Sequence, residues 1–397
     1  MTPKTLKAWQ FVHTWSSLVC MVFLLVLCVT GLPLIFGGEI YSALGAAEAP
    51  PQASAHVPAH APFLAVDTHL AAVRALYPGH EITSVTLWRE KPFAQVFLRH
   101  AREVPEAPQE KEAIFDRCTG ERLGQDGQAT PPSPGQRFGL AVMHVMVRLH
   151  LDAYAGIAGM LFYAFMTLLF ILSTISGVVL YGPFMRKLDF GTVRRERSRR
   201  LKWLDVHNLL GIVTLVWVLM IAVTGIFIDI APPLDALWKR DYIEPVQQKY
   251  ADELPLGPDW PVSLQAAIDA AQQRLPDFRV TYISLPGAFT PVHFKLTGHG
   301  TTPFSKNMEN QMLVDARTGE VTDIIEIPWY IRMLQWAFPH FGGYAGMPMK
   351  ILWAILDVLA IIILASGLYL WLARRKSGTA PASPACSNAP AEAIAKS

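Results

Sequence analysis

Charged residues are scarce in this chain, because only 17% of its 397 residues are Asp, Glu, Lys or Arg, whereas 52% are hydrophobic. The mean hydropathy of +0.28 is too high for an ordinary soluble globule. The polar segments that remain are mildly acidic and have no basic face, which argues against a nucleic-acid partner. The composition is therefore that of a membrane protein whose outer parts do not bind nucleic acid.

Cysteines are also few, with four in the whole chain. Cys20 and Cys28 fall in the first apolar run and Cys386 in the tail, so Cys118 stands alone in a polar segment. A single cysteine there cannot form an intramolecular disulfide, and the polar segments must be stabilised by their own cores. Two cofactor motifs are missing as well. The chain has no Cys-x-x-Cys-His for covalent haem attachment and no Gly-x-Gly-x-x-Gly for a dinucleotide.

Long apolar runs, in contrast, are present four times. They cover Val12–Phe36, Ala155–Leu180, Leu209–Ile230 and Ile351–Leu372. A helix of about 20 apolar residues crosses a hydrocarbon core of about 30 Å, so each run predicts a transmembrane helix. A cleaved signal peptide is the alternative for the first run. We reject it because the run is longer than a usual signal core and its counterpart at 207–230 lies in the middle of the chain.

Basic residues flank these runs on one side only. Lys4 and Lys7 precede the first run, and Arg374-Arg375-Lys376 follow the last. The loop between the second and third runs has eight basic residues, namely Arg186, Lys187, Arg194, Arg195, Arg197, Arg199, Arg200 and Lys202, against Asp189 and Glu196. The positive-inside rule predicts a multi-pass membrane protein with both termini in the cytoplasm.

The chain also repeats itself, with two histidines in each half. The stretches 9–31 and 203–225 both read Trp-x-x-x-His and then, at an equal interval, Thr-Gly: His13 with Thr30-Gly31, and His207 with Thr224-Gly225. The second element has a tyrosine one helical turn after the histidine and, again at an equal interval, Ser-Gly: His150, Tyr154 and Ser176-Gly177, and His340, Tyr344 and Ser366-Gly367. Such a repeat decides the architecture.

The polar segments repeat more weakly. The stretches 116–121 and 315–320 share Asp-x-x-Thr-Gly-Glu, which supplies turn residues for a hairpin. Alternating strand patterns precede them at 84–98 and 280–296, after helical patterns at 69–76 and 264–275. We expect each segment to be a small α+β domain. The two units, each helix–domain–helix, have parallel topology and predict a pseudo-two-fold axis along the membrane normal.

The predicted fold is thus a membrane α-helical protein with α+β outer domains. Its parts are an N-terminus with transmembrane helix 1 (1–38), periplasmic domain 1 (39–149), helix 2 (150–182), a basic cytoplasmic loop (183–203), helix 3 (204–231), periplasmic domain 2 (232–339), helix 4 (340–376) and a tail (377–397). The tail is rich in Ala, Pro and Ser from residue 380 and is predicted to be disordered.

The repeat makes the histidines functional candidates, since an imidazole in or near a bilayer core is a functional suspect. Under the axis, His13 faces His207 at the cytoplasmic boundary, and His150 faces His340 at the outer boundary. Zinc and non-haem iron usually need three or four protein ligands. Two opposed imidazoles suit a haem, whose porphyrin supplies the other four. The pattern predicts two bis-histidine haems that form a path for electrons.

Other residues keep two interpretations each. Gly31 lies five helical turns from His13, and Gly225 has the same relation to His207, so both predict close approach of a macrocycle or of a neighbouring helix. Tyr154 and Tyr344 shape the outer haem pocket or anchor the membrane interface. Asp357 lies in the middle of a span, where it relays a proton or binds a quinone-like donor, or is protonated and bonded to a neighbouring helix.

These residues resemble a known family. Trp9-x-x-x-His13 with Thr30-Gly31, Leu149-His150, Val206-His207 with Thr224-Gly225, and the stretch from His340 to Arg375 are similar to the PepSY-associated transmembrane-helix family. The resemblance covers Lys7 to Lys376, and within the family it is nearest to the FoxB-type ferric-siderophore reductases. It implies a place in the bacterial inner membrane, PepSY-like outer domains in the periplasm, and two haem b groups on His13, His207, His150 and His340. It also implies reduction of a periplasmic ferric siderophore to release Fe(II). His144 departs from the repeat, since its counterpart is Leu334, and it competes with His150 as the outer ligand.

The chain is therefore expected to be an oxidoreductase that lies in a lipid bilayer. A cytoplasmic reductase or a quinol must supply the electrons, because no donor site is visible in the sequence. Two alternatives stay open. One is a non-enzymatic PepSY protein that binds or restrains a periplasmic partner, and the other is a di-haem reductase of a substrate that is not a siderophore.

Overall fold

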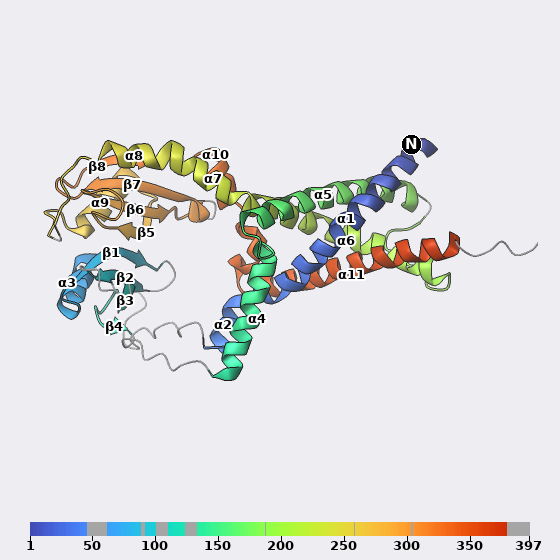
Figure 1. Cartoon of the computed structure of the whole chain (residues 1–397), viewed down its shortest axis with the longest axis horizontal. Helices are drawn as coiled ribbons and strands as arrows, with labels where there is room; N and C mark the ends of the chain where they lie inside the picture. Colours follow the sequence, from blue (N-terminus) through green and yellow to red (C-terminus); the bar gives the residue numbers. More distant parts are fainter. Residues whose placement is uncertain are drawn as a thin grey trace, which may run out of the picture.

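A computed structural model describes residues 1–45, 62–88, 92–100, 110–123, 133–186, 188–257, 259–302 and 305–378. Figure 1 shows two parts, a sheet domain at one end and a bundle of long helices at the other. The N-terminus lies at the end of the bundle that is farthest from the sheet domain (Figure 1). Lys187 of the basic loop and the tail from residue 379, where we expected disorder, lie outside the described residues.

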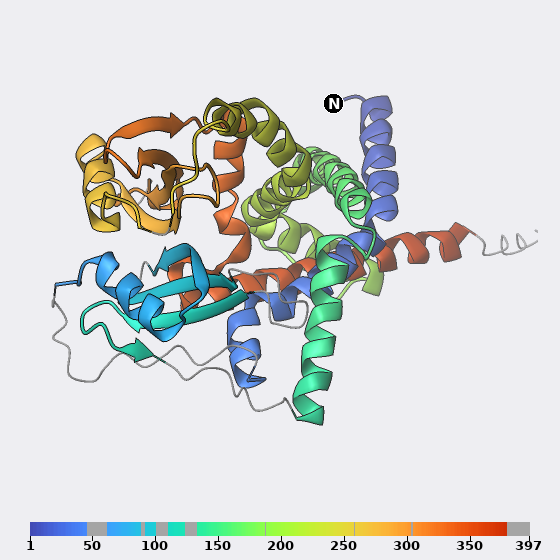
Figure 2. The ribbon, with the colours of Figure 1, turned by 60° about the vertical axis from the view of Figure 1, so that its left-hand side comes forward.

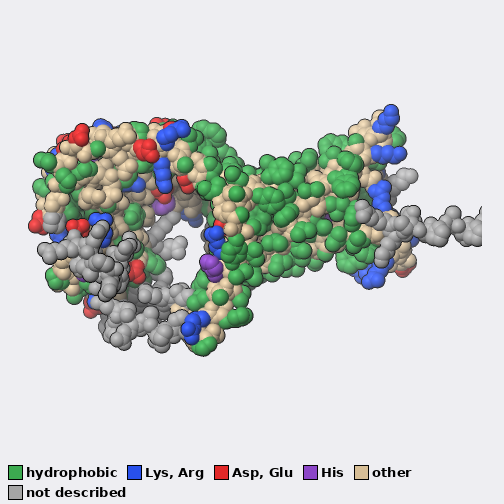
Figure 3. Space-filling view, in the orientation of Figure 1, with side chains coloured by type: hydrophobic (Ala, Val, Ile, Leu, Met, Phe, Trp, Pro, Cys, Tyr) green, Lys and Arg blue, Asp and Glu red, His purple; other side chains and the backbone are tan. Residues whose placement is uncertain are grey.

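Four helices of the bundle are long and apolar enough to cross a membrane. They are α1 (Pro3–Ile35), α5 (Ile157–Met185), α6 (Arg199–Asp229) and α11 (Met347–Gly378). Their most apolar 18-residue windows have mean hydropathies of 2.8, 2.1, 2.6 and 2.5. The surface of the bundle is covered by hydrophobic side chains, and Lys and Arg gather at its far end (Figure 3). The four predicted spans are confirmed, and each helix extends beyond its apolar run at one end at least.

The bundle has a definite neighbour order. Helix α1 packs against α5 and α11, and α6 packs against the same two helices, so α1 and α6 lie diagonally opposite each other (Figure 2). Side-chain caps help to fix the starts of α1 and α6, because Thr2 accepts a hydrogen bond from the amide of Thr5 and Ser198 accepts one from the amide of Leu201. Side chains of α1 and α6 that point inward therefore face each other across the centre of the bundle.

Helix α4 was not expected from the sequence. It spans Pro134–Leu151, begins with a capping box formed by Ser133 and Gln136, and packs against α1. Figure 1 shows it crossing obliquely beside the bundle, with its C-terminal end at the bundle. The remaining short helices are α2 (Gly37–Ala43), α7 (Ala231–Trp238), the π-helix η1 (Lys239–Ile243), α8 (Glu244–Lys249), η2 (Ser305–Asn307), α10 (Trp329–Gln335), η3 (Phe338–Phe341) and η4 (Gly343–Ala345).

The two polar segments build a single antiparallel sheet of eight strands in the order β4-β3-β2-β1-β5-β6-β7-β8. The strands are β1 (His80–Leu87), β2 (Phe93–His100), β3 (Glu110–Asp116), β4 (Arg122–Leu123), β5 (Arg279–Ser284), β6 (His293–His299), β7 (Glu309–Asp315) and β8 (Val321–Ile325). The expected hairpins at the two Asp-x-x-Thr-Gly-Glu turns are confirmed.

The seam between the two halves differs from our expectation of two separate domains. Strand β1 pairs with β5 over a short stretch, from Ser84 opposite Ser284 to Thr86 opposite Tyr282, so the halves share one sheet. Helices α3 (Val66–Leu76) and α9 (Leu264–Arg274) lie against each other and against the sheet, and both contribute to one hydrophobic core. The halves are therefore joined through backbone hydrogen bonds and through a common core.

A side chain also crosses between the halves. The carboxylate of Asp67 on α3 accepts hydrogen bonds from the amides of Leu264 and Gln265, at 2.8 and 2.9 Å. These amides belong to the first turn of α9 and have no partner within their own helix. Asp67 thus stabilises the start of α9 from the other half of the chain.

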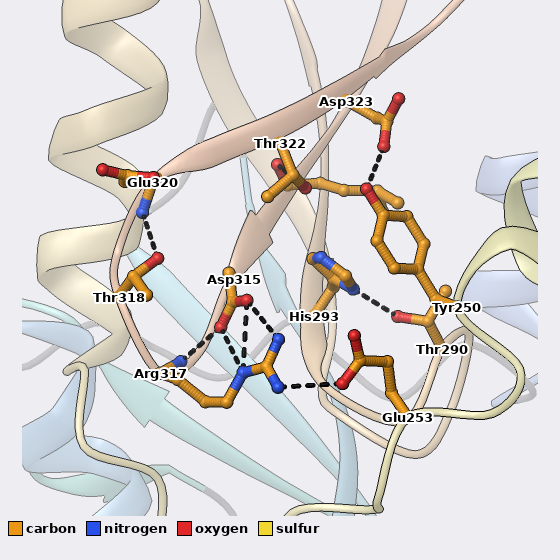
Figure 4. A network of polar contacts seen from close by, with 11 residues as sticks. Tyr250, Glu253, Thr290, His293, Asp315, Arg317, Thr318, Glu320, Thr322 and Asp323 are labelled. Carbon is orange, nitrogen blue, oxygen red and sulfur yellow. Dashed lines mark hydrogen bonds and ion pairs between the residues drawn. The ribbon is translucent and has the colours of Figure 1, made fainter.

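The second half contains a polar network beside β6 and β7 (Figure 4). Arg317 forms ion pairs with Asp315 at 2.7 Å and with Glu253 at 2.9 Å. His293 is fully buried, with Nδ1 3.1 Å from the hydroxyl of Thr290 and its ring 4.2 Å from that of Tyr250. Burial lowers the pKa of His293, so the imidazole is neutral in the folded protein at neutral pH.

Candidate functional site: two facing histidine pairs

Four histidines meet in two pairs inside the bundle. His13 on α1 faces His207 on α6, and their ring centroids are 6.4 Å apart with planes at 76°. We call them the far pair, because they lie toward the end of the bundle away from the sheet domain. His150, in the last turn of α4, faces His340 in η3, with centroids 6.5 Å apart and planes at 61°. These two form the sheet-side pair.

Each imidazole is held by the backbone of a neighbouring helix in its own half of the chain. Nδ1 of His13 lies 2.9 Å from the carbonyl oxygen of Ser173, and Nδ1 of His207 lies 3.1 Å from that of Ile363. Nδ1 of His150 lies 3.0 Å from the carbonyl oxygen of Leu27. His340 likewise bonds to the backbone of Ile221. The four contacts are the same interaction, formed once at each station of the sequence repeat.

A hydroxyl stands beside each of these carbonyls. The Nδ1 atoms lie 3.0 to 3.3 Å from the hydroxyl oxygens of Ser176, Thr30, Ser366 and Thr224, for His13, His150, His207 and His340 respectively. Each hydroxyl also donates its proton to a carbonyl of its own helix, at 2.6 to 2.9 Å. The hydroxyl oxygen is therefore left to accept a hydrogen bond from the imidazole.

These contacts fix the tautomer of every ring. A carbonyl oxygen can only accept, so Nδ1 must carry the proton and donate it. The neutral imidazole then presents Nε2 as an unprotonated nitrogen with a free electron pair. A hydrogen bond from the other ring nitrogen to a carbonyl is how proteins orient histidines that bind metals. The arrangement prepares all four rings for ligation through Nε2.

Glycines make room for the rings. A Cβ atom built on Gly31 would lie 3.0 Å from Cε1 of His150, and one on Gly177 would lie 3.1 Å from Cε1 of His13. At Gly225 and Gly367 the corresponding distances, to His340 and His207, are 3.4 Å. The structure thus places Gly31 and Gly225 against histidines of the sheet-side pair. The Thr-Gly and Ser-Gly dipeptides each supply a hydroxyl and a gap for one imidazole, and we call such a dipeptide a socket.

The two pairs lie far apart along the axes of the helices. On α1, His13 belongs to the far pair, whereas Thr30 near the other end of the helix contacts the sheet-side pair. The helical rise between these two positions amounts to about 25 Å. The same interval separates His207 from Thr224 on α6. The pairs therefore lie near opposite ends of a membrane span.

The spacing within each pair fits a metal ion between the rings. An imidazole nitrogen binds a metal at about 2.0 Å, and the centroid of a five-membered ring with bonds of about 1.33 Å lies about 1.1 Å from each atom. Two imidazoles on opposite sides of one ion thus have centroids about 6.2 Å apart, close to the 6.4 and 6.5 Å observed. Among the described residues no group of three or more His, Cys, Asp or Glu could hold a metal. The donor set suits a haem iron with two axial nitrogens.

The chain turns sharply after His150. Ala153 and Tyr154 have positive φ values of 49° and 61°, and Gly156 has 60°. This backbone is rarely adopted by residues other than glycine. Asp152 stabilises the turn by accepting a hydrogen bond from the amide of Tyr154, and it forms an ion pair with Arg148 at 2.7 Å. The turn lets α4 end and α5 begin with His150 directed at the bundle.

Two side chains that we did not single out from the sequence support the outer histidines. The hydroxyl of Tyr163 donates to the carbonyl of Leu149, and Nε1 of Trp353 donates to the carbonyl of Pro339. Each acceptor directly precedes its histidine, and the interval from histidine to donor is the same in both halves. This equal interval was the available signal, although the two residue types differ.

Tyr154 and His144 lie outside this constellation, and the side chain of a third candidate is not described. The side chain of Tyr154 is 52% exposed and sits under the guanidinium of Arg148. The backbone of Tyr344 belongs to η4, and its side chain is not among those described. His144 is exposed on α4, six residues before His150 and hence on another face of the helix, whereas His150 is the residue that faces His340.

Asp357 is buried between α11 and α1. Its carboxyl hydrogen-bonds to Cys28, and its Oδ2 atom is buried without a partner. Cys28 directly follows Leu27, whose carbonyl accepts from His150, so Asp357 lies at the depth of the sheet-side pair. Of our two interpretations, the bond to a neighbouring helix is present in the structure.

Comparison with known proteins agrees with this architecture. A sequence model of the PepSY-associated TM region matches residues 10–374, a range that includes all four histidines. The chain is also similar to an uncharacterized protein of Pseudomonas aeruginosa, with 24% identity over 259 residues. The alignment covers 60% of this chain and 65% of that protein, so it spans just under two thirds of the relative's length.

Proposed function

We propose an electron-transfer function for this chain, which belongs to the family of the PepSY-associated TM region. It is a multi-pass membrane protein with four spanning helices. The single observation that carries the proposal is the set of four imidazoles in two facing pairs, each with Nδ1 tied to a carbonyl and Nε2 left free. Two haem b groups bound at the pairs would supply one-electron transfer between the ends of the bundle.

The protein's own residues have defined parts in this function. His13 and His207 would hold one group, and His150 and His340 the other, while the four sockets orient the rings and exclude the other tautomer. The four spanning helices are apolar, as the face of the bundle in Figure 3 shows, and they keep the path out of water. A haem iron that took one nitrogen from each histidine of a pair, besides the four of its porphyrin, would have no free position, which would favour electron transfer over binding of oxygen.

The orientation of the chain in the membrane follows from the charges. Lys and Arg gather at the far end of the bundle, so the positive-inside rule assigns this end to the cytoplasm and the sheet domain to the periplasm (Figure 3). The two helix–domain–helix units, with the sheet halves as PepSY-like modules, then run in the same sense across the bacterial inner membrane. The substrate is a ferric siderophore, whose Fe(III) gains one electron and leaves as Fe(II). Each electron comes from a cytoplasmic reductase or a quinol.

Stopped-flow spectroscopy tests this function. The haem-loaded protein is reduced with dithionite, freed of excess reductant and mixed with a ferric siderophore, and the haem bands are followed. We expect reoxidation together with formation of Fe(II), which a ferrous-specific dye detects. The gallium(III) form of the same chelator is the control, because gallium does not accept the electron. Bands that stay reduced with every ferric siderophore would contradict the proposed substrate class.

A partner-binding role without electron transfer is the alternative expected of PepSY modules. The double variant His13→Ala/His207→Ala separates the two, since neither residue lies in the sheet domain. An electron-transfer protein keeps only the sheet-side haem in this variant and no longer passes electrons from one end of the bundle to the other, whereas a protein that only binds a partner keeps its activity.

A further inference from the structure

A large cavity lies in the sheet domain, away from the histidine pairs. It has a volume of about 760 Å³ and is bounded by α3, α9 and the seam where β1 meets β5. Its walls include Phe63, Trp88, Arg117, Gln272, Arg279 and Thr281. Cavities of roughly 300 to 1,000 Å³ hold small molecules in proteins. This one has contributions from both halves of the chain, so it exists only because the halves share one sheet.

The charge of the cavity has one sign. Among the described residues that line it, Arg117 and Arg279 are basic and none is acidic. One nitrogen of Arg279 donates to the carbonyls of Pro276 and Phe278, which anchors the guanidinium at the end of β5. Arg279 has the carboxylate of Asp277 nearby, so Arg117 is the cation that is left to attract an anion from solution. The walls therefore favour a negatively charged ligand.

Of the two arginines, Arg117 gives the stronger evidence for an anionic ligand. Its guanidinium lies over the ring of Phe63, 3.9 Å from the centroid, and its Nε atom is buried without a hydrogen-bond partner. Burial also lowers the pKa of Arg117. A buried donor that lacks an acceptor costs about 1–3 kcal/mol, and more when the group is charged. Arg117 is thus a desolvated cation in the wall of the cavity.

The start of α3 adds to the positive electrostatic potential in the cavity. Residues 64–66 line the cavity, and Ala65, the cap residue of this 11-residue helix, makes no side-chain hydrogen bond to the first turn. The N-terminus of a helix has a partial positive charge and free amide donors. Asp67, the acidic residue of this turn, directs both carboxylate oxygens to the amides of α9. Hydrogen bonds to neutral amides leave the negative charge of Asp67 in place, so it offsets part of this positive charge.

Aromatic side chains complete the walls. Phe63 and Trp88 both line the cavity, and the guanidinium of Arg117 stacks on the first of them. Such planar surfaces suit a ligand with flat rings, while arginines recognise paired oxygens through two parallel hydrogen bonds. A ligand with both features is an anion whose oxygens are attached to, or lie beside, an aromatic or other planar group.

We infer that this cavity binds an anionic, oxygen-rich chelate of a trivalent metal, of the catecholate or carboxylate class. The choice of a metal chelate rests on the proposed function, whereas the preference for an organic anion rests on the cavity itself. Within that function, the cavity selects anionic ferric chelates over the neutral or cationic hydroxamate type, which the two arginines disfavour.

Binding of a gallium(III) tris-catecholate to the full-length protein in detergent tests the inference. Gallium has the charge of Fe(III) but is not reduced, so binding is measured without electron transfer. Titration calorimetry gives the affinity, and quenching of Trp88 fluorescence reports occupation of the cavity. A Trp88→Phe variant identifies that signal. We expect saturable binding that weakens as the salt concentration rises, since the attraction is electrostatic.

Variants of the two arginines make the test specific. Arg117→Gln and Arg279→Gln should each weaken binding about tenfold or more, as expected for loss of a charge-assisted hydrogen bond. Arg117→Lys keeps the charge and should bind better than Arg117→Gln. Arg99→Gln is the matched control, because Arg99 is exposed and pairs with Glu81 at the other end of β1. Thermal unfolding of each variant shows that it is folded.

Several results would overturn the inference. They are an absence of binding by the wild-type protein, equal affinities in the Arg117→Gln and wild-type proteins, and binding of a cationic gallium hydroxamate as tight as that of the catecholate. This binding test and the test of the proposed function can succeed or fail independently of each other. If the gallium chelate binds and its ferric form is not reduced, the proposed binding in the cavity is upheld and the electron-transfer proposal fails. If ferric chelates are reduced but do not bind in this cavity, only the cavity proposal fails.

Discussion

The four glycines of the sockets allow a graded prediction. An ordinary carbon–carbon contact is about 3.5–4.0 Å, so alanine at Gly31, with its Cβ 3.0 Å from the ring of His150, falls short by at least about half an ångström. At Gly225 the distance to His340 is 3.4 Å, close to an ordinary contact. The two positions are equivalent in the repeat, and each serves as the control for the other.

Two opposing free energies set the size of the effect. Replacing glycine by alanine inside a helix stabilises the helix by about 1 kcal/mol, whereas overpacking a tight contact costs about 1–3 kcal/mol. Gly225→Ala should therefore leave the free energy of unfolding unchanged or raise it by up to about 1 kcal/mol. Gly31→Ala should lower it by up to about 2 kcal/mol and displace His150 from Leu27 and Thr30.

Thermal unfolding and the absorption spectrum of the haem-loaded protein provide the measurements. We expect Gly31→Ala to lose or shift the spectrum of one haem and to leave the other unchanged, while Gly225→Ala keeps both. The far pair supplies a second comparison, since Gly177 is at 3.1 Å and Gly367 at 3.4 Å from their rings. Equal effects at Gly31 and Gly225, or a larger effect at Gly225, would refute the reasoning from socket size.

Three further predictions concern the supports of the site and the sheet domain. Tyr163→Phe and Trp353→Phe each remove a hydrogen bond to the carbonyl that precedes an outer histidine, and each should lower stability by about 1 kcal/mol in thermal unfolding, with a change in the spectrum of the sheet-side haem alone. Loss of signal from both haems would count against this local role. Asp67→Ala removes the two bonds to the first turn of α9 and should destabilise the sheet domain by about 1–2 kcal/mol, which denaturant unfolding measures; an unchanged midpoint would contradict the link between the halves. Because burial lowers the folded-state pKa of His293, the unfolded chain takes up a proton first as the pH falls below about 6.5. The stability this neutral imidazole gives above that pH is lost in acid, by up to about 1.4 kcal/mol per pH unit. The variant His293→Phe has the residue that the first half has at the same register position, Phe93. It should show a smaller change in unfolding temperature between pH 7 and pH 5 than the wild-type protein. An equally large change in the variant would exclude His293 as the source of the pH dependence.

The sequence predicted the bundle well, because its signals are local. Four apolar runs gave four helices, and fixed intervals from His13 and His207 to their Thr-Gly dipeptides predicted that histidines from the two halves would meet. The structure brings both pairs together at 6.4 and 6.5 Å. The periodicity of the helices and the equal spacing of the repeat contained that information.

The contacts between segments that are distant in sequence were not predictable in this way. The seam between β1 and β5 is short, and no local pattern distinguishes its residues from other strand residues. The sockets were visible as Thr-Gly and Ser-Gly repeats, but their use depends on which helix packs beside which histidine. Gly31 shares a face with His13 by periodicity, yet the ring that fills its gap is that of His150.

Haem content per chain tests the central claim most directly. The full-length protein, purified after expression with added haem, is assayed by the pyridine haemochromogen method together with its His13→Ala and His150→Ala variants. We predict two haem b per wild-type chain and one in each variant, with a different haem missing in the two spectra. A wild-type protein without haem, or variants that both retain two, would contradict the assignment of the facing histidine pairs as haem ligands.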